Sequence, residues 1–204
     1  MPSIDHLALS SHNLSEGVLL ACQALGTQFA GGGKHDLMGT HNQLLGLGDL
    51  YLEVIAVDPQ AQAVARPRWF DLDNFSGAPR LTNWVVRCDN LEVALAVCPQ
   101  GMGVPVQLER GAYRWRMAVP QDGRLPFDGC FPALIEWQGS AHPAQALPDS
   151  GLRLRRLVIA HPEAARLSAA LSPLLQDDRL LITHGDQKQM KALFEGPDGE
   201  IWLS

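Results

Sequence analysis

The chain has 204 residues, of which 46% are hydrophobic, and this is enough for the core of one large domain or two small modules. Its 16 Lys and Arg are outnumbered by 22 Asp and Glu, the formal net charge is -6, and no basic run occurs, so we expect no nucleic-acid partner. Because no apolar run reaches the roughly 18 residues of a membrane span, and the amino terminus passes straight into a strand pattern, we expect no membrane contact and a cytoplasmic protein.

The amino-terminal residues follow the pattern of a β-α-β-β-β unit. Residues 4–10 alternate with the period of a strand, and residues 13–26 carry a helix cap, a buried stripe and a terminal glycine. Residues 42–47 and 50–57 predict a hairpin across a Gly-Asp turn. We therefore assign residues 1–60 to a first βαβββ module.

A short edge strand of the first unit is predicted at residues 27–30. A second unit follows after residues 61–80, which form a linker that is either a lid or a buried crossing. The pattern then restarts, because residues 81–103 match residues 4–26 in the order of their apolar and polar positions. We assign residues 81–140 to a second βαβββ module, whose further strands are expected at 104–110, 113–119 and 131–137.

A spacer rich in Pro and Ala precedes a third start. Residues 152–161 predict a strand, residues 162–175 predict a helix with proline in its first turn, and further strands follow. We assign residues 152–204 to a third, shorter module-like segment of βαβ type. The three patterns together predict an α+β fold built from repeated modules.

Three side chains in these modules suggest a metal site. Glu53 lies in a strongly apolar strand, where an ionised carboxylate needs a wetter face, a cation or a metal. His6 lies in the first strand, and Glu136 holds in the second module the place that Glu53 holds in the first. If the modules pair as pseudo-twofold partners, the three side chains meet on one concave surface. An imidazole and two carboxylates suit Fe(II), Mn(II), Zn(II) or Ni(II) and leave coordination positions open.

The same residues have plainer interpretations. His6 is equally typical of a half-buried structural histidine, and each glutamate can instead pair with an arginine. The candidate arginines are Arg80, Arg87, Arg114 and Arg116. Both interpretations stay open at the level of the sequence.

A polar cluster follows the triple glycine at residues 31–33. It consists of Lys34, His35, Thr40, His41 and Asn42. These side chains either shape a tight turn or form a substrate-binding edge at the mouth of a cup, to which we add Arg80. The triple glycine alone is weak evidence for phosphate binding, because no GK[ST] follows it.

Several stretches together point to one protein family. They are DH at 5–6, GGGKHDLMGTHN at 31–42, LGDLYLEVIAVDP at 47–59, RLTNWVVR at 80–87 and LIEW at 134–137. With the doubled βαβββ plan, they resemble the glyoxalase-like domain branch of the vicinal oxygen chelate superfamily. The resemblance covers nearly the whole chain and is most specific between Gly31 and Pro59.

The resemblance implies a cupped mixed sheet of paired βαβββ modules, with helices packed outside, around a divalent metal. The ligands come from the first and last strands of each module, which here places them at His6, Glu53 and Glu136. Asn83 stands where a histidine or glutamine ligand is expected, and an amide is a poor ligand for a transition metal. The segment over 152–204 falls outside the two-module plan.

The resemblance also implies a function. The first expectation is a divalent-metal-dependent lyase, isomerase or dioxygenase acting on a small oxygen-bearing substrate. Glu136 or Glu53 would move a proton in this enzyme, and His41 or His35 would be an orienting or acid group. The alternative is a metal-free protein that binds or sequesters a small molecule in the same cup, which Asn83 favours. The modules would pair within one chain or across a homodimer.

Overall fold

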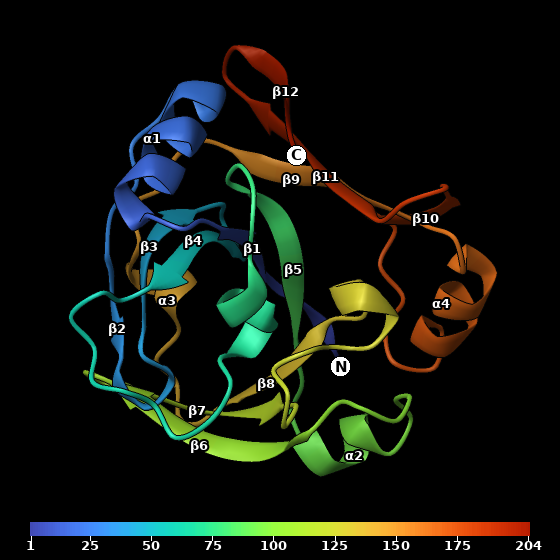
Figure 1. Cartoon of the computed structure of the whole chain (residues 1–204). Coiled ribbons are helices and arrows are strands. Elements are labelled where there is room, and N and C mark those ends of the chain that lie inside the picture. The colour runs from blue at the N-terminus through green and yellow to red at the C-terminus, as the bar shows by residue number, and fades with distance from the viewer.

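Two β-sheets organise the chain in the computed structural model, which describes residues 1–204 (Figure 1). The larger sheet is built from two successive runs of elements. The first run comprises β1 (Ser3–Ser10), α1 (Leu14–Leu25), β2 (Gly32–His35), the short 3-10 turn η1 (Asp36–Met38), β3 (Thr40–Gly46) and β4 (Tyr51–Val57). The second run comprises β5 (Arg80–Arg87), α2 (Leu91–Leu95), β6 (Val104–Arg110), β7 (Tyr113–Val119), the 3-10 turn η3 (Phe127–Gly129) and β8 (Ala133–Trp137).

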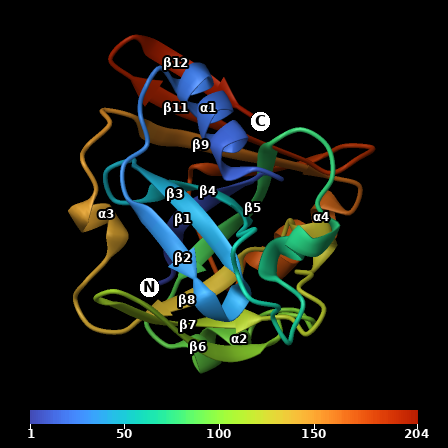
Figure 2. The ribbon, with the colours of Figure 1, turned by 60° about the vertical axis from the view of Figure 1, so that its left-hand side comes forward.

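The two runs pair their strands in the same way. The order across the larger sheet is β2-β3-β4-β1-β5-β8-β7-β6, with β1 parallel to β4 and β5 parallel to β8. The central strands β1 and β5 are antiparallel, so the runs join within one chain. The edge strands β2 and β6 contact each other, which curves the sheet into a nearly closed cup (Figures 1 and 2). The expected α+β fold with a cupped mixed sheet is confirmed.

Local sequence signals explain where several elements begin and end. Asn13 caps α1, because its side chain accepts hydrogen bonds from the N–H groups of Ser15 and Glu16. Gly26 ends the helix in the left-handed conformation. The expected edge strand at 27–30 is wrong, since β2 covers Gly32–His35, five residues further on. There Gly32 lies so close to β3 that a Cβ atom would stand 2.2 Å from the Asn42 carbonyl oxygen.

The smaller sheet belongs to the carboxy-terminal part. It follows α3 (Pro143–Ala146) and comprises β9 (Arg153–His161), α4 (Ala164–Leu171), β10 (Leu180–His184), β11 (Gln189–Gly196) and β12 (Gly199–Leu203). Its order is β10-β9-β11-β12, and β9 is parallel to β10, as a βαβ unit requires. In the first run, by contrast, the first strand is parallel to the last. The segment is therefore of βαβ type, with a pairing of its own.

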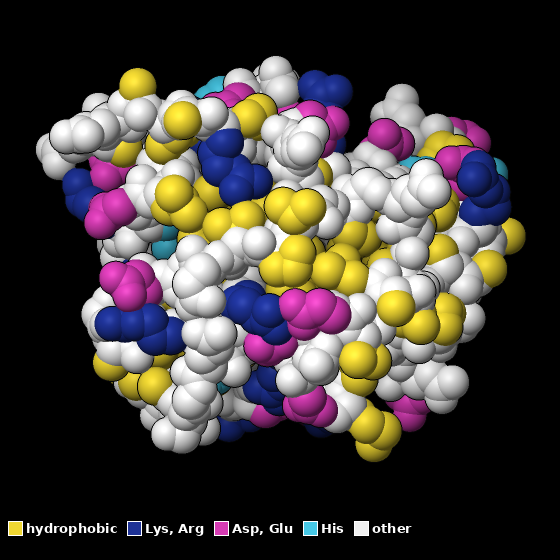
Figure 3. Space-filling model, turned by 90° about the horizontal axis from the view of Figure 1, so that it is seen from below, with side chains coloured by type: hydrophobic (Ala, Val, Ile, Leu, Met, Phe, Trp, Pro, Cys, Tyr) yellow, Lys and Arg dark blue, Asp and Glu magenta, His cyan; other side chains and the backbone are white.

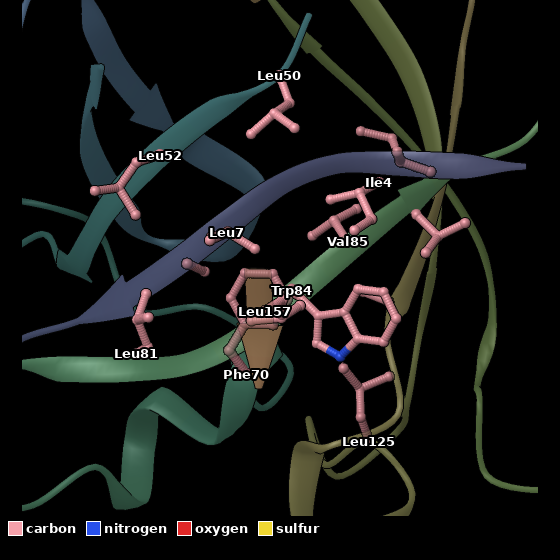
Figure 4. Packing of buried hydrophobic residues seen from close by; sticks show 14 of the residues in the cluster. Ile4, Leu7, Leu50, Leu52, Phe70, Leu81, Trp84, Val85, Leu125 and Leu157 are labelled. Atoms are coloured by element: carbon pink, nitrogen blue, oxygen red, sulfur yellow. The ribbon is translucent and has the colours of Figure 1, made fainter. Parts of the chain in front are cut away.

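One continuous core joins the two sheets. The carboxy-terminal residues Leu157, Phe194 and Leu203 belong to the same buried cluster as β1 and β5, and α1 contacts β12. Figure 4 shows Ile4 of β1 packed near Val85 of β5, with the Trp84 ring beside Leu125. The Trp84 indole N–H donates to the Cys130 carbonyl at 2.8 Å, so even its polar atom is satisfied in the core.

The surface and the helices carry few further signals. No helix is both long and apolar enough to cross a membrane. Seen from below, Lys and Arg side chains lie among Asp and Glu, with hydrophobic side chains between them (Figure 3). This face therefore presents no block of one charge.

The segment between the two runs closes the cup. It contains the 3-10 segment η2 (Trp69–Asn74), which contacts β4 and lies within the curve of the larger sheet (Figure 1). Trp69 and Phe70 are buried, and both line the interior of the cup. Within residues 61–80 only Trp69, Phe70 and Leu72 are buried, so the segment is not a buried crossing but a cover that places these side chains over the cup.

Candidate functional site

A small cavity lies inside the cup. Its volume is about 30 Å³, which is room for one or two water molecules. The polar side chains around it are His6, His35, Asn42, Glu53 and Arg110. The walls are largely aromatic and come from Tyr51, Trp69, Phe70, Trp115 and Trp137.

A bulge in β1 places Asp5 beside His6, which lines this cavity. Ile4 pairs with Val86 and His6 pairs with Val85, so Asp5 between them has no partner in β5. Such an extra residue re-aims the side chains next to it. The Asp5 carboxylate can therefore contact the ring of His6, and strict strand alternation would have separated the two.

Asp5 accepts hydrogen bonds from three side chains. Its Oδ1 lies 2.5 Å from His6 Nδ1, and its Oδ2 lies 2.9 Å from both Trp137 Nε1 and His142 Nε2. Burial alone would raise the pKa of Asp5, but the hydrogen bonds from His142 and His6 outweigh burial and hold this pKa well below its usual range. Asp5 is therefore a carboxylate at neutral pH.

The Asp5 charge fixes the hydrogen on each histidine ring. An ionised carboxylate only accepts, so His6 Nδ1 and His142 Nε2 must carry hydrogens. His142 agrees with this assignment, because its Nδ1 accepts from the Ala144 N–H at 3.2 Å. A neutral His6 then keeps the lone pair on Nε2, and the ring is held flat against Tyr51, with centroids 4.4 Å apart.

Glu53 stands opposite the free nitrogen of His6. Its Oε2 is 3.7 Å from His6 Nε2, and its Oε1 accepts from Asn42 Nδ2 at 2.5 Å. The Asn42 oxygen accepts from Arg110 Nη1 at 2.8 Å and from the Gly33 N–H at 2.9 Å. These bonds orient the amide with its NH₂ group toward Glu53, so a carboxylate that is only 5% exposed is held in place.

His35 joins the other side of this network. Arg110 Nη1 lies 3.3 Å from His35 Nε2, and His35 Nδ1 lies 3.1 Å from the Thr40 hydroxyl. Burial, and then the Arg110 charge, lower the pKa of His35 to about 3. His35 is therefore neutral at pH 7, with Nε2 as acceptor from Arg110 and Nδ1–H as donor to Thr40.

The structure brings five of the predicted site residues together. They are His6, His35, Thr40, Asn42 and Glu53. His41 lies between Thr40 and Asn42 on β3, and strand alternation places it on the opposite face, away from the cavity. Arg80 lines a different cavity, described below, and so does Asn83.

Glu136 does not reach the cup. Its neighbours Ile135 and Trp137 line the cavity, and Glu136 alternates to the outer face of β8. There Arg116 Nη2 lies 2.7 Å from its Oε2, which also accepts the Leu91 N–H at the start of α2. The expectation that Glu136 meets His6 and Glu53 therefore fails, and the pairing with an arginine is the one that forms.

The donor set does not complete a metal site. His6 Nε2 and Glu53 Oε2 are two suitable donors, and the Asp5 hydrogen bond behind His6 is typical of a ligating histidine. Catalytic sites ordinarily add a third protein ligand. No group of three His, Cys, Asp or Glu side chains is placed to hold a metal, and the Asn42 oxygen already accepts from Arg110.

Four contributors to this site were missed from the sequence: Asp5, Tyr51, Arg110 and His142. Asp5 adjoins His6 in the DH pair, which was the one available signal. Arg110 ends β6 before a turn, and His142 lies in the spacer after β8, so no periodic pattern points to either.

The chain is similar to several solved structures. A hypothetical protein from Staphylococcus aureus is 12% identical, and the match covers 93% of this chain and 88% of that chain with a TM-score of 0.63. Methylmalonyl-CoA epimerase from Streptomyces coelicolor, in complex with 2-nitronate-propionyl-CoA, is 15% identical, covering 68% of this chain and 97% of that chain with a TM-score of 0.44. The Mycobacterium tuberculosis epimerase is 16% identical, covering 68% and 88% with a TM-score of 0.42.

The family comparison is the decisive one. No curated protein matches the chain, and identities this low to solved structures show the fold alone. The model of the family described as "Glyoxalase-like domain" matches residues 4–175, which is most of the chain. The glyoxalase-like resemblance found in the sequence is thereby confirmed, and the chain belongs to the glyoxalase-like domain family.

Proposed function

We propose that this protein is an enzyme of the lyase or isomerase type that moves a proton on a small oxygen-bearing molecule held in the cup. The observation that carries the proposal is the pairing of His6 with Asp5. A buried carboxylate holds the hydrogen on Nδ1, so Nε2 can accept a proton from a bound molecule. The resulting imidazolium is stabilised by Asp5 on one side and Glu53 on the other.

Arg110 supplies a positive charge that complements the negative charge formed on a molecule that loses a proton. It lines the same cavity and forms no ion pair with a carboxylate, because its Nη1 contacts only His35 and Asn42. A molecule that loses a proton next to a carbonyl group develops negative charge on its oxygen, and a guanidinium stabilises that charge in a cavity shielded from water. A small carbonyl compound with an acidic C–H bond therefore fits the site best.

The size of the cavity restricts how such a molecule enters. About 30 Å³ is too small for most metabolites, so Trp69 and Phe70 must move outward when a ligand enters. The Trp69 indole N–H is buried without a hydrogen-bond acceptor. An oxygen atom of a bound ligand or of a water molecule would accept a hydrogen bond from this N–H group, which is consistent with a cup that binds a polar ligand.

Divalent-metal dependence is the second candidate, including the dioxygenase chemistry expected from the sequence. The 3.7 Å spacing of His6 Nε2 and Glu53 Oε2 favours it, since two donors on one ion are about 3–4 Å apart when each bond is about 2.1 Å. Only two protein ligands are available, however, and Arg110 adds a positive charge to the same cavity. We therefore place metal dependence second and derive no step from it.

Hydrogen exchange tests the proposal. The protein is incubated in D₂O with a panel of small α-keto acids and hydroxyketones, and loss of the C–H signal is followed by proton NMR. We expect exchange that His6→Ala abolishes and that His41→Ala, which alters a histidine outside the cup, leaves intact. A chelator distinguishes the candidates, because exchange that persists supports the dyad alone and exchange that disappears supports the metal. Ligand binding without exchange would instead favour the metal-free binding protein.

A further inference from the structure

A second and larger cavity lies beside the cup. Its volume is about 260 Å³, and it is formed where η2, η3 and the turn between β10 and β11 approach β5. Phe70 lines both cavities and so stands between them. We propose that this second cavity binds a small oxyanion, a carboxylate or a phosphate group, between Arg80 and Lys188.

The carboxylates at this cavity already have partners. Asp71 accepts hydrogen bonds from Asn74 Nδ2 at 2.6 Å and from Arg124 Nε at 3.2 Å. Asp128 Oδ2 lies 3.3 Å from His161 Nε2, whose other ring nitrogen accepts the Glu163 N–H. Neither carboxylate forms an ion pair with Arg80 or Lys188.

The two cations lack carboxylate partners. Arg80 Nη1 donates to the carbonyl oxygens of Ser76 at 2.7 Å and Ala78 at 3.1 Å, and its guanidinium lies 4.6 Å from the centre of the Phe75 ring. The Lys188 ammonium donates to the Asp128 carbonyl oxygen. The remaining donors of both side chains are free to bind an anion in the cavity they line.

The two positive charges also disfavour each other. Burial lowers the pKa of Lys188, the charges of Asp128 and Asp71 raise it in part, and the charge of Arg80 opposes them by lowering it. An oxyanion between them would remove this repulsion and satisfy donors on both sides. The cavity therefore has the charge pattern of an anion site, with three cations, Arg80, Arg124 and Lys188, against the two carboxylates.

The backbone around the cavity is shaped in the same way as the backbone at His6. Ala8 pairs with Asn83 and Leu9 pairs with Leu81, so Thr82 is the extra residue of a bulge in β5. Thr82 and Asn83 consequently both line the cavity. Asn83, which was expected at a metal site, thus contributes to the wall of this second cavity, where its Nδ2 donates to the Gly129 carbonyl oxygen at 3.3 Å.

Isothermal titration calorimetry tests the site with two probes, inorganic phosphate and malonate, in a buffer without other oxyanions. We expect saturable binding of at least one probe, and the stronger probe identifies the preferred oxyanion. Arg80→Gln and Lys188→Gln should each weaken it about tenfold, the effect of losing one charge-assisted hydrogen bond. Arg155→Gln is the matched control, because Arg155 is exposed on the other sheet and pairs with Glu195.

Two further results would overturn the proposal. One is the absence of saturable binding by either probe, and the other is binding that survives both substitutions. His6→Ala separates this site from the cup. We expect it to leave phosphate or malonate binding unchanged, and a loss of binding in His6→Ala would show that the probe binds near Arg110 instead.

Discussion

Replacing Asp5 with asparagine tests the buried network most severely. The carboxylate accepts from His6, Trp137 and His142, and two of these bonds share Oδ2. The amide oxygen of an asparagine would keep the position shared by Trp137 and His142. Its NH₂ group would then face His6 Nδ1, where two hydrogens oppose each other.

The His6 ring can avoid these opposed hydrogens only by changing its tautomer. Its hydrogen would move to Nε2 and point toward Glu53, so the free base in the cup would be lost. We expect Asp5→Asn to lower the free energy of unfolding by about 3 kcal/mol, because bonds to a charged acceptor contribute about 1.5–3 kcal/mol each and are weakened rather than deleted. Proton exchange should also fall to the level of His6→Ala.

Urea unfolding at pH 7 and at pH 3 measures this effect. Because the pKa of Asp5 in the folded protein lies below its ordinary value of 3.8, the stabilisation is complete above that value and is lost as the pH falls further. The difference in the free energy of unfolding between the parent and Asp5→Asn should therefore be smaller at pH 3 than at pH 7. Asp186→Asn is the control, because Asp186 is exposed and forms no ion pair. An effect of Asp5→Asn no larger than that of the control would refute the reasoning.

Three further predictions concern the fold and the site. Gly32→Ala should lower the free energy of unfolding by about 2–3 kcal/mol, because its Cβ would meet Asn42, whereas Gly139→Ala, also at positive φ but in open space, should cost about 1 kcal/mol in the same urea titration. Glu136→Gln should cost about 1–2 kcal/mol through Arg116 and leave exchange unchanged, and lost exchange would contradict the placement of Glu136 outside the cup. The pKa of His35 is about 3 in the folded protein and ordinarily 6.5, so the unfolded chain takes up a proton first as the pH falls between these values, and the free energy of unfolding should decrease. In a His35→Gln variant, the melting temperature should depend less steeply on pH over the same range.

The contrast between Glu53 and Glu136 shows how far the sequence could predict the site. Both lie in apolar strands, and matching YLEVI with ALIEW makes them equivalent. In β4 the residues facing the cup are Tyr51 and Glu53, whereas in β8 they are Ile135 and Trp137. A shift of one residue turns a side chain to the other face, and periodicity alone does not fix that phase.

The two bulges limited the prediction in a different way. Alternation and capping residues were enough for β1 and α1, because these signals are local. The bulges at Asp5 and Thr82 depend on the pairing of β1 with β5, which are far apart in the chain. They bring Asp5 to His6 and Asn83 to the second cavity, and local sequence signals predict neither placement.

The most direct measurement of the central claim is a nitrogen–proton NMR spectrum of the histidine rings at pH 7, assigned with His6→Ala. We predict that His6 carries a hydrogen on Nδ1, where the ring meets the Asp5 carboxylate. A His6 ring protonated on Nε2, with Nδ1 bare beside Asp5, would contradict this prediction, because no base would then face the cup.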